Sequence, residues 1–152
     1  MENIILEPFK IIGISIRTTN ENGQAAKDIP LLWEKLMREN ILSNIPDKID
    51  NTIYSVYTDY EKDFTKPYTT LLGCKVNSLD IIPEGMVGYS FDGGVYKKFT
   101  AKGDLSKGVV INEWNKIWTM NLKRAYTADF EIYGGKSQDT LNAEVDILIA
   151  LQ

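Results

Sequence analysis

The chain has 152 residues, 43% of them hydrophobic and 25% charged, which is the size and composition of one ordinary domain with a full core. Its formal net charge is −4 and it has no run of basic residues, so we expect that this chain alone binds no nucleic acid. Histidine is absent, and Cys74 is the one cysteine. These counts exclude Ser-His-Asp and Cys-His catalysis, imidazole metal sites and internal disulfides, and we expect no cofactor and no metal.

The sequence also predicts the compartment. Its first residues contain an early acid and a short apolar run but lack the basic start of a signal peptide, and no stretch approaches the ~20 apolar residues of a membrane span. A single cysteine is typical of a reducing compartment. We therefore expect a cytoplasmic protein without a membrane partner, in which Cys74 is a buried, inert thiol.

The first half of the chain has the pattern of a strand, a helix and two further strands. Residues 9–18 alternate apolar side chains and predict a strand, which ends at the turn-forming NENGQ. Asp28 can cap a helix that opens at Ile29 and Pro30 and carries apolar residues at helical spacing in LLWEKLMREN. Residues 52–60 and 68–76 predict two strands, joined by the charged segment EKDFTKP.

The second half repeats this order. Residues 86–91 lead through a glycine-rich turn into a predicted strand at 95–103, and Asp104 or Ser106 can cap the next helix. ADFEIYGG and AEVDILIAL, joined by a polar loop, predict the last two strands. The helix that precedes these two strands has one apolar stripe, which consists of Val110, Ile111, Trp114, Ile117 and Trp118.

The repeated order predicts an internal duplication, of residues 1–76 and 86–152, within a single domain that spans residues 1–152. Trp33 aligns with Trp114 when the two predicted helices are superimposed, which strengthens the match. Two such halves favour an α+β fold in which duplicated strand-helix-strand-strand units form a curved antiparallel sheet. We expect both helices on one face of this sheet and a ligand groove on the other.

Glu131 is the strongest candidate for a functional side chain. Because successive residues of a strand point to opposite faces, Glu131 and Tyr133 share one face, and Phe130 and Ile132 share the other. If Phe130 and Ile132 face the helices, Glu131 and Tyr133 face the groove, together with two residues of the first half, Ser55 and Tyr57. The alternative is that Glu131 is an ordinary solvated carboxylate on a strand, and the pattern leaves both interpretations open.

The tryptophans of the second predicted helix also have two interpretations. Trp114 and Trp118 are most simply core residues on the apolar stripe. Trp118, however, lies in the last turn, where a ring can extend past the edge of the core. It is therefore a candidate for lining a pocket.

The whole chain resembles the GyrI-like effector-binding domain, the ligand module of AraC-type and MerR-type multidrug regulators, which also occurs alone. The resemblance rests on EPFKIIGISIRT, on IYSVYTDYEKDFTKPYTTLLGCKV, on YKKFTAKG before a helix with two tryptophans, and on ADFEIYG before EVDILIAL. In drug-binding members a glutamate of the FE-x-Y strand contacts cationic aromatic ligands in an aromatic-walled pocket. The resemblance implies this role for Glu131, between Phe130 and Tyr133. We expect a stand-alone member, since no helix-turn-helix pattern precedes the first strand.

The residues and the resemblance together predict a protein that binds amphipathic, cationic aromatic molecules, for drug sensing or sequestration. One alternative implied by the family is a hydrolase of strained, cyclopropane-bearing genotoxins, with Glu131 and Trp118 as its catalytic residues. Another is a module that binds and shields a protein partner such as DNA gyrase. The predicted ligand-binding residues are Glu131, Tyr133, Trp118, Tyr57, Tyr89 and Ser55.

Overall fold

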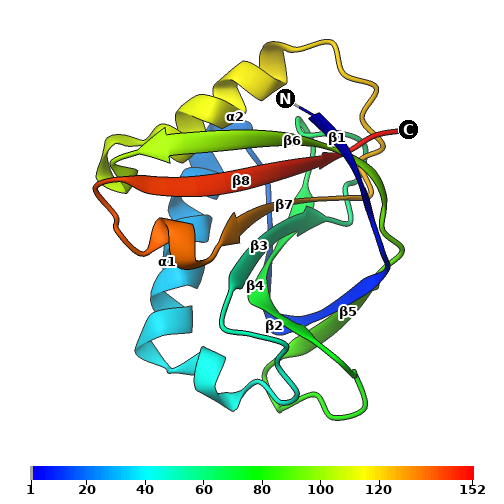
Figure 1. Ribbon diagram of the computed structural model, residues 1–152, viewed down its shortest axis with the longest axis vertical. Coiled ribbons are helices and arrows are strands. Elements are labelled where there is room, and N and C mark those ends of the chain that lie inside the picture. The colour runs from blue at the N-terminus through cyan, green and yellow to red at the C-terminus, as the bar shows by residue number, and fades with distance from the viewer. Residues whose placement is uncertain (1) are drawn as a thin grey trace.

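The computed structural model describes residues 2–152 and consists of an eight-stranded antiparallel sheet with two α-helices (Figure 1). Neither helix of the described chain has the length and apolar character that crossing a bilayer requires. The first half contains β1 (Glu2–Leu6), β2 (Phe9–Thr18), α1 (Gln24–Arg38), β3 (Ile53–Thr58) and β4 (Tyr68–Val76). The second half contains β5 (Val87–Phe91), β6 (Gly94–Gly103), α2 (Val109–Thr119), β7 (Ala128–Tyr133) and β8 (Ala143–Ala150).

The strands lie side by side in the order β1-β6-β8-β7-β3-β4-β2-β5, and each neighbouring pair is antiparallel. This order is symmetric with respect to the two halves of the chain. If β1 is exchanged with β5, β2 with β6, β3 with β7 and β4 with β8, the same order results, read from the other edge of the sheet. Strands β3 and β7 meet at the centre, where Ser55 pairs with Glu131. The predicted α+β class and curved antiparallel sheet are confirmed. The internal duplication, which this order supports, remains a proposal.

The inner face of the curled sheet carries an aromatic core. Phe130 lies at its centre, with its ring 5.4 Å from that of Phe9 and 5.5 Å from that of Tyr96. Phe91 of the edge strand β5 belongs to the same cluster, although β5 and β6 lie far apart in the strand order. The curl therefore lets side chains from most of the sheet fill its inner face.

Both helices pack on the other, outer face of the sheet (Figure 1). Leu36 of α1 packs with Ile14 and Leu72 of β2 and β4, and Ile117 of α2 packs with the opposite end of the sheet, on Phe99 and Ile147 of β6 and β8. The cavity described below lies between these helices. The prediction of a groove on the face opposite the helices is therefore wrong, because Phe130 and its neighbours occupy the inner face.

The observed strands agree with the predicted ones within two residues, but the start of the chain and of α1 differ. The prediction omitted β1, which pairs with β6. Helix α1 begins at Gln24, before the predicted start at Ile29, and Asp28 does not cap it, since its carboxylate accepts hydrogen bonds from Thr18 and Gln24. Pro30 consequently lies inside the helix, where its ring removes one backbone N–H donor.

Strands β2 and β4 approach closely at a pair of glycines. Gly13 and Gly73 are direct partners in the register. A β-carbon added to Gly13 would lie 1.9 Å from the carbonyl oxygen of Leu72, and one added to Gly73 would lie 2.1 Å from that of Ile12. Neither position can accommodate a side chain unless the two strands separate.

Candidate functional site

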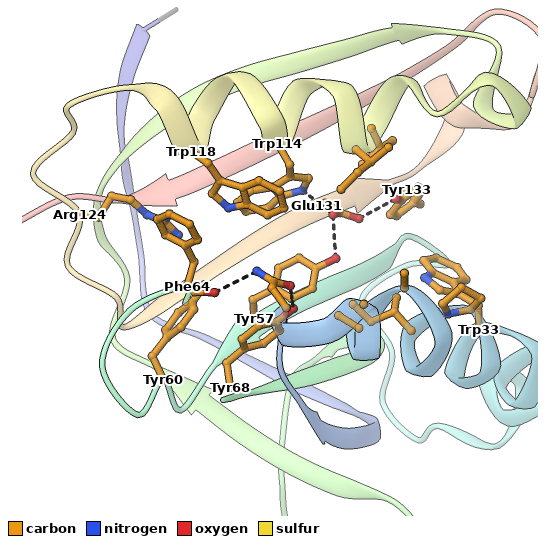
Figure 2. A pocket seen from close by; sticks show the side chains of 18 residues that line it. Trp33, Tyr57, Tyr60, Phe64, Tyr68, Trp114, Trp118, Arg124, Glu131 and Tyr133 are labelled. Atoms are coloured by element: carbon orange, nitrogen blue, oxygen red, sulfur yellow. Dashed lines mark hydrogen bonds between the residues drawn. The ribbon is translucent and has the colours of Figure 1, made fainter. Parts of the chain in front are cut away.

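A cavity of about 570 Å³ lies over the central strands β3 and β7, between α1 and α2 (Figure 2). Its lining is mostly aromatic and aliphatic, and the charged side chains among the described lining residues are those of Glu131 and Arg124. All three tryptophans of the chain take part. The lining residues are Asn20, Gly23, Ala25, Ala26, Ile29, Pro30, Trp33, Tyr57, Tyr60, Phe64, Tyr68, Val110, Ile111, Trp114, Trp118, Arg124, Glu131 and Tyr133.

Glu131 is a buried carboxylate held by three hydrogen bonds (Figure 2). Its Oε2 accepts one from the Tyr57 hydroxyl and one from the Trp114 indole Nε1, both at 2.7 Å, and its Oε1 accepts one from the Tyr133 hydroxyl at 2.6 Å. The side chain is only 3% exposed. None of the donors within residues 2–152 that bond to it is a basic side chain.

The environment of Glu131 changes its acidity. Burial raises the pKa of the Glu131 carboxyl, because removal from water disfavours the charged form. The hydrogen bonds from Tyr133, Tyr57 and Trp114 act in the opposite direction, since they stabilise the carboxylate. Desolvation is the larger effect, so the carboxyl is a weaker acid than an exposed glutamate.

The two tyrosines beside Glu131 are themselves constrained as donors. Burial and the adjacent carboxylate raise the pKa of Tyr57 and of Tyr133, so both hydroxyls keep their protons at neutral pH. Ser55 donates a hydrogen bond to the Tyr57 hydroxyl at 3.2 Å. This bond directs the Tyr57 proton toward Glu131.

A tryptophan packs against each of these tyrosines from the helix above. The ring of Trp114, on α2, lies 5.5 Å from that of Tyr57 on β3 at an interplanar angle of 87°. Trp33, on α1, lies 4.9 Å from Tyr133 on β7 at 76°. Each contact joins a helix of one half to a strand of the other. Aromatic walls therefore flank Glu131 on both sides.

The loop between β3 and β4 closes the end of the cavity that Trp118 lines. Its Phe64 ring stacks on Trp118 with the centroids 5.6 Å apart and the planes at 13°. Asn20 anchors this loop, since its amide donates a hydrogen bond to the Phe64 carbonyl oxygen at 3.0 Å and accepts one from Tyr68 at 2.6 Å. These bonds fix the position of the aromatic side chains that the loop contributes.

A second buried charged group, Arg124, lines this same end of the cavity. Its Nη2 donates to Oδ2 of Asp129 at 2.8 Å, and both side chains are almost fully buried. The carboxylate of Asp129 also accepts hydrogen bonds from the Tyr60 hydroxyl at 2.6 Å and from the backbone N–H of Ala150 at 2.8 Å. The pair ties the loop after α2 to β7 and β8.

Comparison with known proteins assigns the chain to a family. Residues 4–151 match the family described as integron-associated effector binding protein. The chain belongs to this family. The effector-binding character expected from the sequence is thereby confirmed, whereas the narrower GyrI-like assignment remains a prediction.

Three similar proteins illustrate the relationship. An integron cassette protein from the mobile metagenome of Vibrio cholerae is 32% identical, with a TM-score of 0.75 over 99% of this chain and 95% of its own. SAV2435, solved with tetraphenylphosphonium bound, shares the fold at 18% identity, with a TM-score of 0.79 over 99% of this chain and 93% of its own. YobU of Bacillus subtilis (strain 168), named as a candidate transcriptional regulator, is 26% identical over 97% of this chain and 94% of its own.

The structure brings four of the six predicted ligand-binding residues together in the cavity of this effector-binding protein: Glu131, Tyr133, Trp118 and Tyr57. Ser55 lies on the same face but is fully buried beneath Tyr57 and does not line the cavity. Tyr89 lies outside it as well, because β5 is an edge strand on which its ring stacks with Phe91 and its hydroxyl bonds to Asp59. These two placements correct the prediction.

Several lining residues were not predicted. The apolar stripe predicts Trp114 as a core residue, and its ring is indeed buried in the α2 core, but its indole N–H also donates to Glu131. Trp33 is one of the apolar residues at helical spacing in the first predicted helix, and Phe64 is the aromatic residue of the linker EKDFTKP, but neither position indicates a pocket by itself. Arg124 lies in the irregular segment after α2, where no periodicity predicts the direction of a side chain.

Proposed function

We propose that this effector-binding protein binds amphipathic aromatic cations in the cavity, with Glu131 as the counter-charge. The observation that carries the proposal is the state of Glu131, which is buried, receives three hydrogen bonds from neutral donors and has no basic partner among residues 2–152. A buried carboxylate without a cation is unfavourable in the protein alone. A cationic ligand supplies the missing charge.

The walls of the cavity suit such a ligand. The faces and edges of Trp33, Trp114 and Trp118 line it together with four tyrosines and Phe64. A cation over the face of an aromatic ring gains about 0.5–2 kcal/mol, with more when the site excludes water. The apolar part of the ligand gains from burial against the same rings. The site thus favours a lipophilic cation over a small hydrated one.

The size of the cavity and its relatives support this ligand class. Its volume of about 570 Å³ is in the usual range for sites that enclose drug-sized molecules. SAV2435, which has the same fold, binds tetraphenylphosphonium, an aromatic cation of this kind. The family is named for effector binding, and YobU is named as a candidate regulator. We infer that the role of binding here is drug sensing or sequestration.

Titration with tetraphenylphosphonium tests the proposal directly. All three tryptophans line the cavity, so we expect saturable quenching of tryptophan fluorescence with one ligand per chain. The ligand should be recovered chemically unchanged by mass spectrometry. Quenching that fails to saturate at millimolar ligand would refute the proposed function.

The affinity for a permanent cation should depend on pH. Since burial raises the pKa of Glu131, part of the protein holds this carboxyl neutral at mildly acidic pH, and binding must then release its proton. We expect affinity for tetraphenylphosphonium to increase as pH rises through the pKa of Glu131, and to level off above it. Calorimetric titrations in buffers of different ionisation enthalpy would measure the proton release. An affinity that is flat from about pH 4.5 to 8 contradicts this expectation.

A hydrolase remains the main alternative, because a carboxyl with a raised pKa can exchange protons near neutral pH. The geometry of the site gives this alternative little support. Both oxygens of Glu131 already accept hydrogen bonds, and no second acid among residues 2–152 lines the cavity to activate water. We therefore expect no turnover of ordinary esters, amides or phosphates, and at most slow opening of a strained ring.

Incubation with an excess of a cyclopropane-bearing electrophile, followed by mass spectrometry, measures this turnover. Stoichiometric recovery of intact ligand agrees with a binding protein. Many turnovers per chain that Glu131→Gln abolishes would instead establish the enzyme.

A further inference from the structure

Arg124 retains hydrogen-bonding groups that the protein does not use. The residue is 5% exposed and lines the cavity. Its Nη2 donates to Asp129, but Nε and Nη1 are buried and have no hydrogen-bond partner among residues 2–152. Unpaired N–H donors of a buried guanidinium are strongly unfavourable, so the site favours any acceptor that reaches them.

The side chain of Arg124 is held in place by its surroundings. The guanidinium lies 4.4 Å from the ring centroid of Tyr126 and 5.6 Å from that of Phe64. Tyr126 adopts a left-handed backbone conformation, with φ of 56°, which non-glycine residues rarely adopt. The backbone of Arg124 bridges to Leu151 at the end of the sheet. The guanidinium therefore has a fixed position at one end of the cavity, with its unpaired donors beneath the surface of the wall.

The charges at Arg124 and at Glu131 are balanced differently. Asp129 neutralises the charge of Arg124, so what Arg124 offers to a ligand is directed N–H donors. Glu131 has its hydrogen bonds but no neutralising cation. The Glu131 end of the cavity therefore favours a positively charged group of the ligand, and the Arg124 end favours a hydrogen-bond acceptor.

We propose that Arg124 forms a second polar subsite, which takes a carboxylate or carbonyl oxygen of the ligand. This subsite proposal rests on the proposed function of Glu131 at the other end of the cavity. It narrows the ligand class to aromatic cations that also carry a hydrogen-bond acceptor, with zwitterions as the strongest binders. Nε and Nη1 lie on different edges of the guanidinium, so each offers its own N–H to a single ligand oxygen, and a charged oxygen accepts the stronger hydrogen bond. Phe64 stacks between Arg124 and Trp118 and forms the apolar wall beside this subsite.

A series of alkyl triphenylphosphonium ions tests the subsite. Each ion with a terminal carboxylate is compared with the unsubstituted alkyl ion of equal length and with the terminal primary amide. We expect the best carboxylate to bind at least about tenfold more tightly than its alkyl counterpart, and the amide to lie between them, because hydrogen bonds to charged groups are the stronger ones. Equal affinities of carboxylate and alkyl ions at every chain length would overturn the subsite.

Arg124→Lys provides the matched variant. It keeps a positive charge beside Asp129 but removes the Nε–H and Nη1–H donors. The advantage of the carboxylate should then fall to less than about threefold, whereas Arg38→Lys, on the exposed end of α1, should leave it unchanged. An undiminished advantage in a folded Arg124→Lys protein would show that the carboxylate binds elsewhere.

Nuclear magnetic resonance of the unmodified protein gives a result that does not depend on the variant folding. The chain has only three arginines, so the Nε–H signals are few. We expect one of them to shift and to exchange more slowly with the carboxylate ligand, and not with the alkyl ligand. An unchanged set of signals on saturation would overturn the proposal.

The series separates the two proposals. If the alkyl ions bind and the carboxylates are no better, the subsite falls and the cation site stands. If only the carboxylates bind, and still bind to Glu131→Gln, the cation site falls and the subsite stands. If no member binds, both fall.

Discussion

Glu131→Gln should weaken binding of an aromatic cation by about 30-fold or more and leave a neutral ligand of the same shape within about threefold, as expected for loss of one member of a buried charge pair worth 2–5 kcal/mol. Suitable ligands are 1-methylquinolinium and 1-methylnaphthalene, which have the same ring system and differ in charge. The substitution retains the volume of the side chain. Its carbonyl oxygen can still accept from Tyr57 and Trp114, the two donors that share Oε2.

The control for this experiment is Glu84→Gln, which removes the same charge from an exposed residue outside the cavity. It separates the local effect of Glu131 from the effect of the net charge of the protein. Calorimetry or tryptophan quenching gives the six dissociation constants that are needed, for the unmodified protein and the two variants with each of the two ligands. Equal losses for the charged and the neutral ligand in Glu131→Gln would mean that the carboxylate serves only as part of the wall.

Gly13→Ala should reduce the free energy of unfolding by about 3 kcal/mol or more, at the upper end of what overpacking usually costs. The new methyl group would lie 1.9 Å from the carbonyl oxygen of Leu72 and 2.7 Å from the Cα of Gly73. Both neighbours are backbone atoms of the adjacent strand, so no side chain can rotate away. The ladder between β2 and β4 must open, directly beneath the residues on which α1 packs.

Thermal unfolding measures the effect. A loss of this size in a protein of this length lowers Tm by roughly 6–12 °C. Gly135→Ala is the matched control, because an added β-carbon there meets nothing within 4 Å and the backbone does not have a positive φ. A Gly13→Ala protein that unfolds within about 2 °C of the unmodified one would show that β2 and β4 separate at little cost.

The sequence predicted the strands and helices well because their signals are local. Alternation in ADFEIY correctly placed Glu131 with Tyr133 and apart from Phe130, and the tryptophan stripe correctly marked the buried face of α2. What alternation cannot determine is which face of the sheet carries the helices. Both faces of β7 are mostly buried, so Phe130 and Glu131 compete for the core, and the prediction chose the wrong face for the cavity.

The composition of the cavity wall also depended on tertiary structure. Trp114 has the same helical spacing whether its indole N–H is unpaired or reaches Glu131, and only the position of α2 over β7 decides. Asn20 and Phe64 meet across 44 residues of chain through a single side-chain bond. Contacts of this kind produce no periodic pattern in the sequence, because each one joins two residues that are far apart in the chain.

By itself, then, the sequence determined the order of the elements after β1, the α+β class and the residues that share each strand face, because each of these follows from local spacing and side-chain chemistry. The alternation left both interpretations of Glu131 open, and only the family resemblance favoured a ligand contact there. The tertiary structure alone decided that the cavity lies between the helices, that Tyr57, Trp114 and Tyr133 converge on the carboxylate, and that Arg124 lies at the other end. The physical reason is the curl of the sheet. It turns one face inward, where aromatic side chains fill it, and directs the helices apart on the other, where a charge can be buried beside open volume.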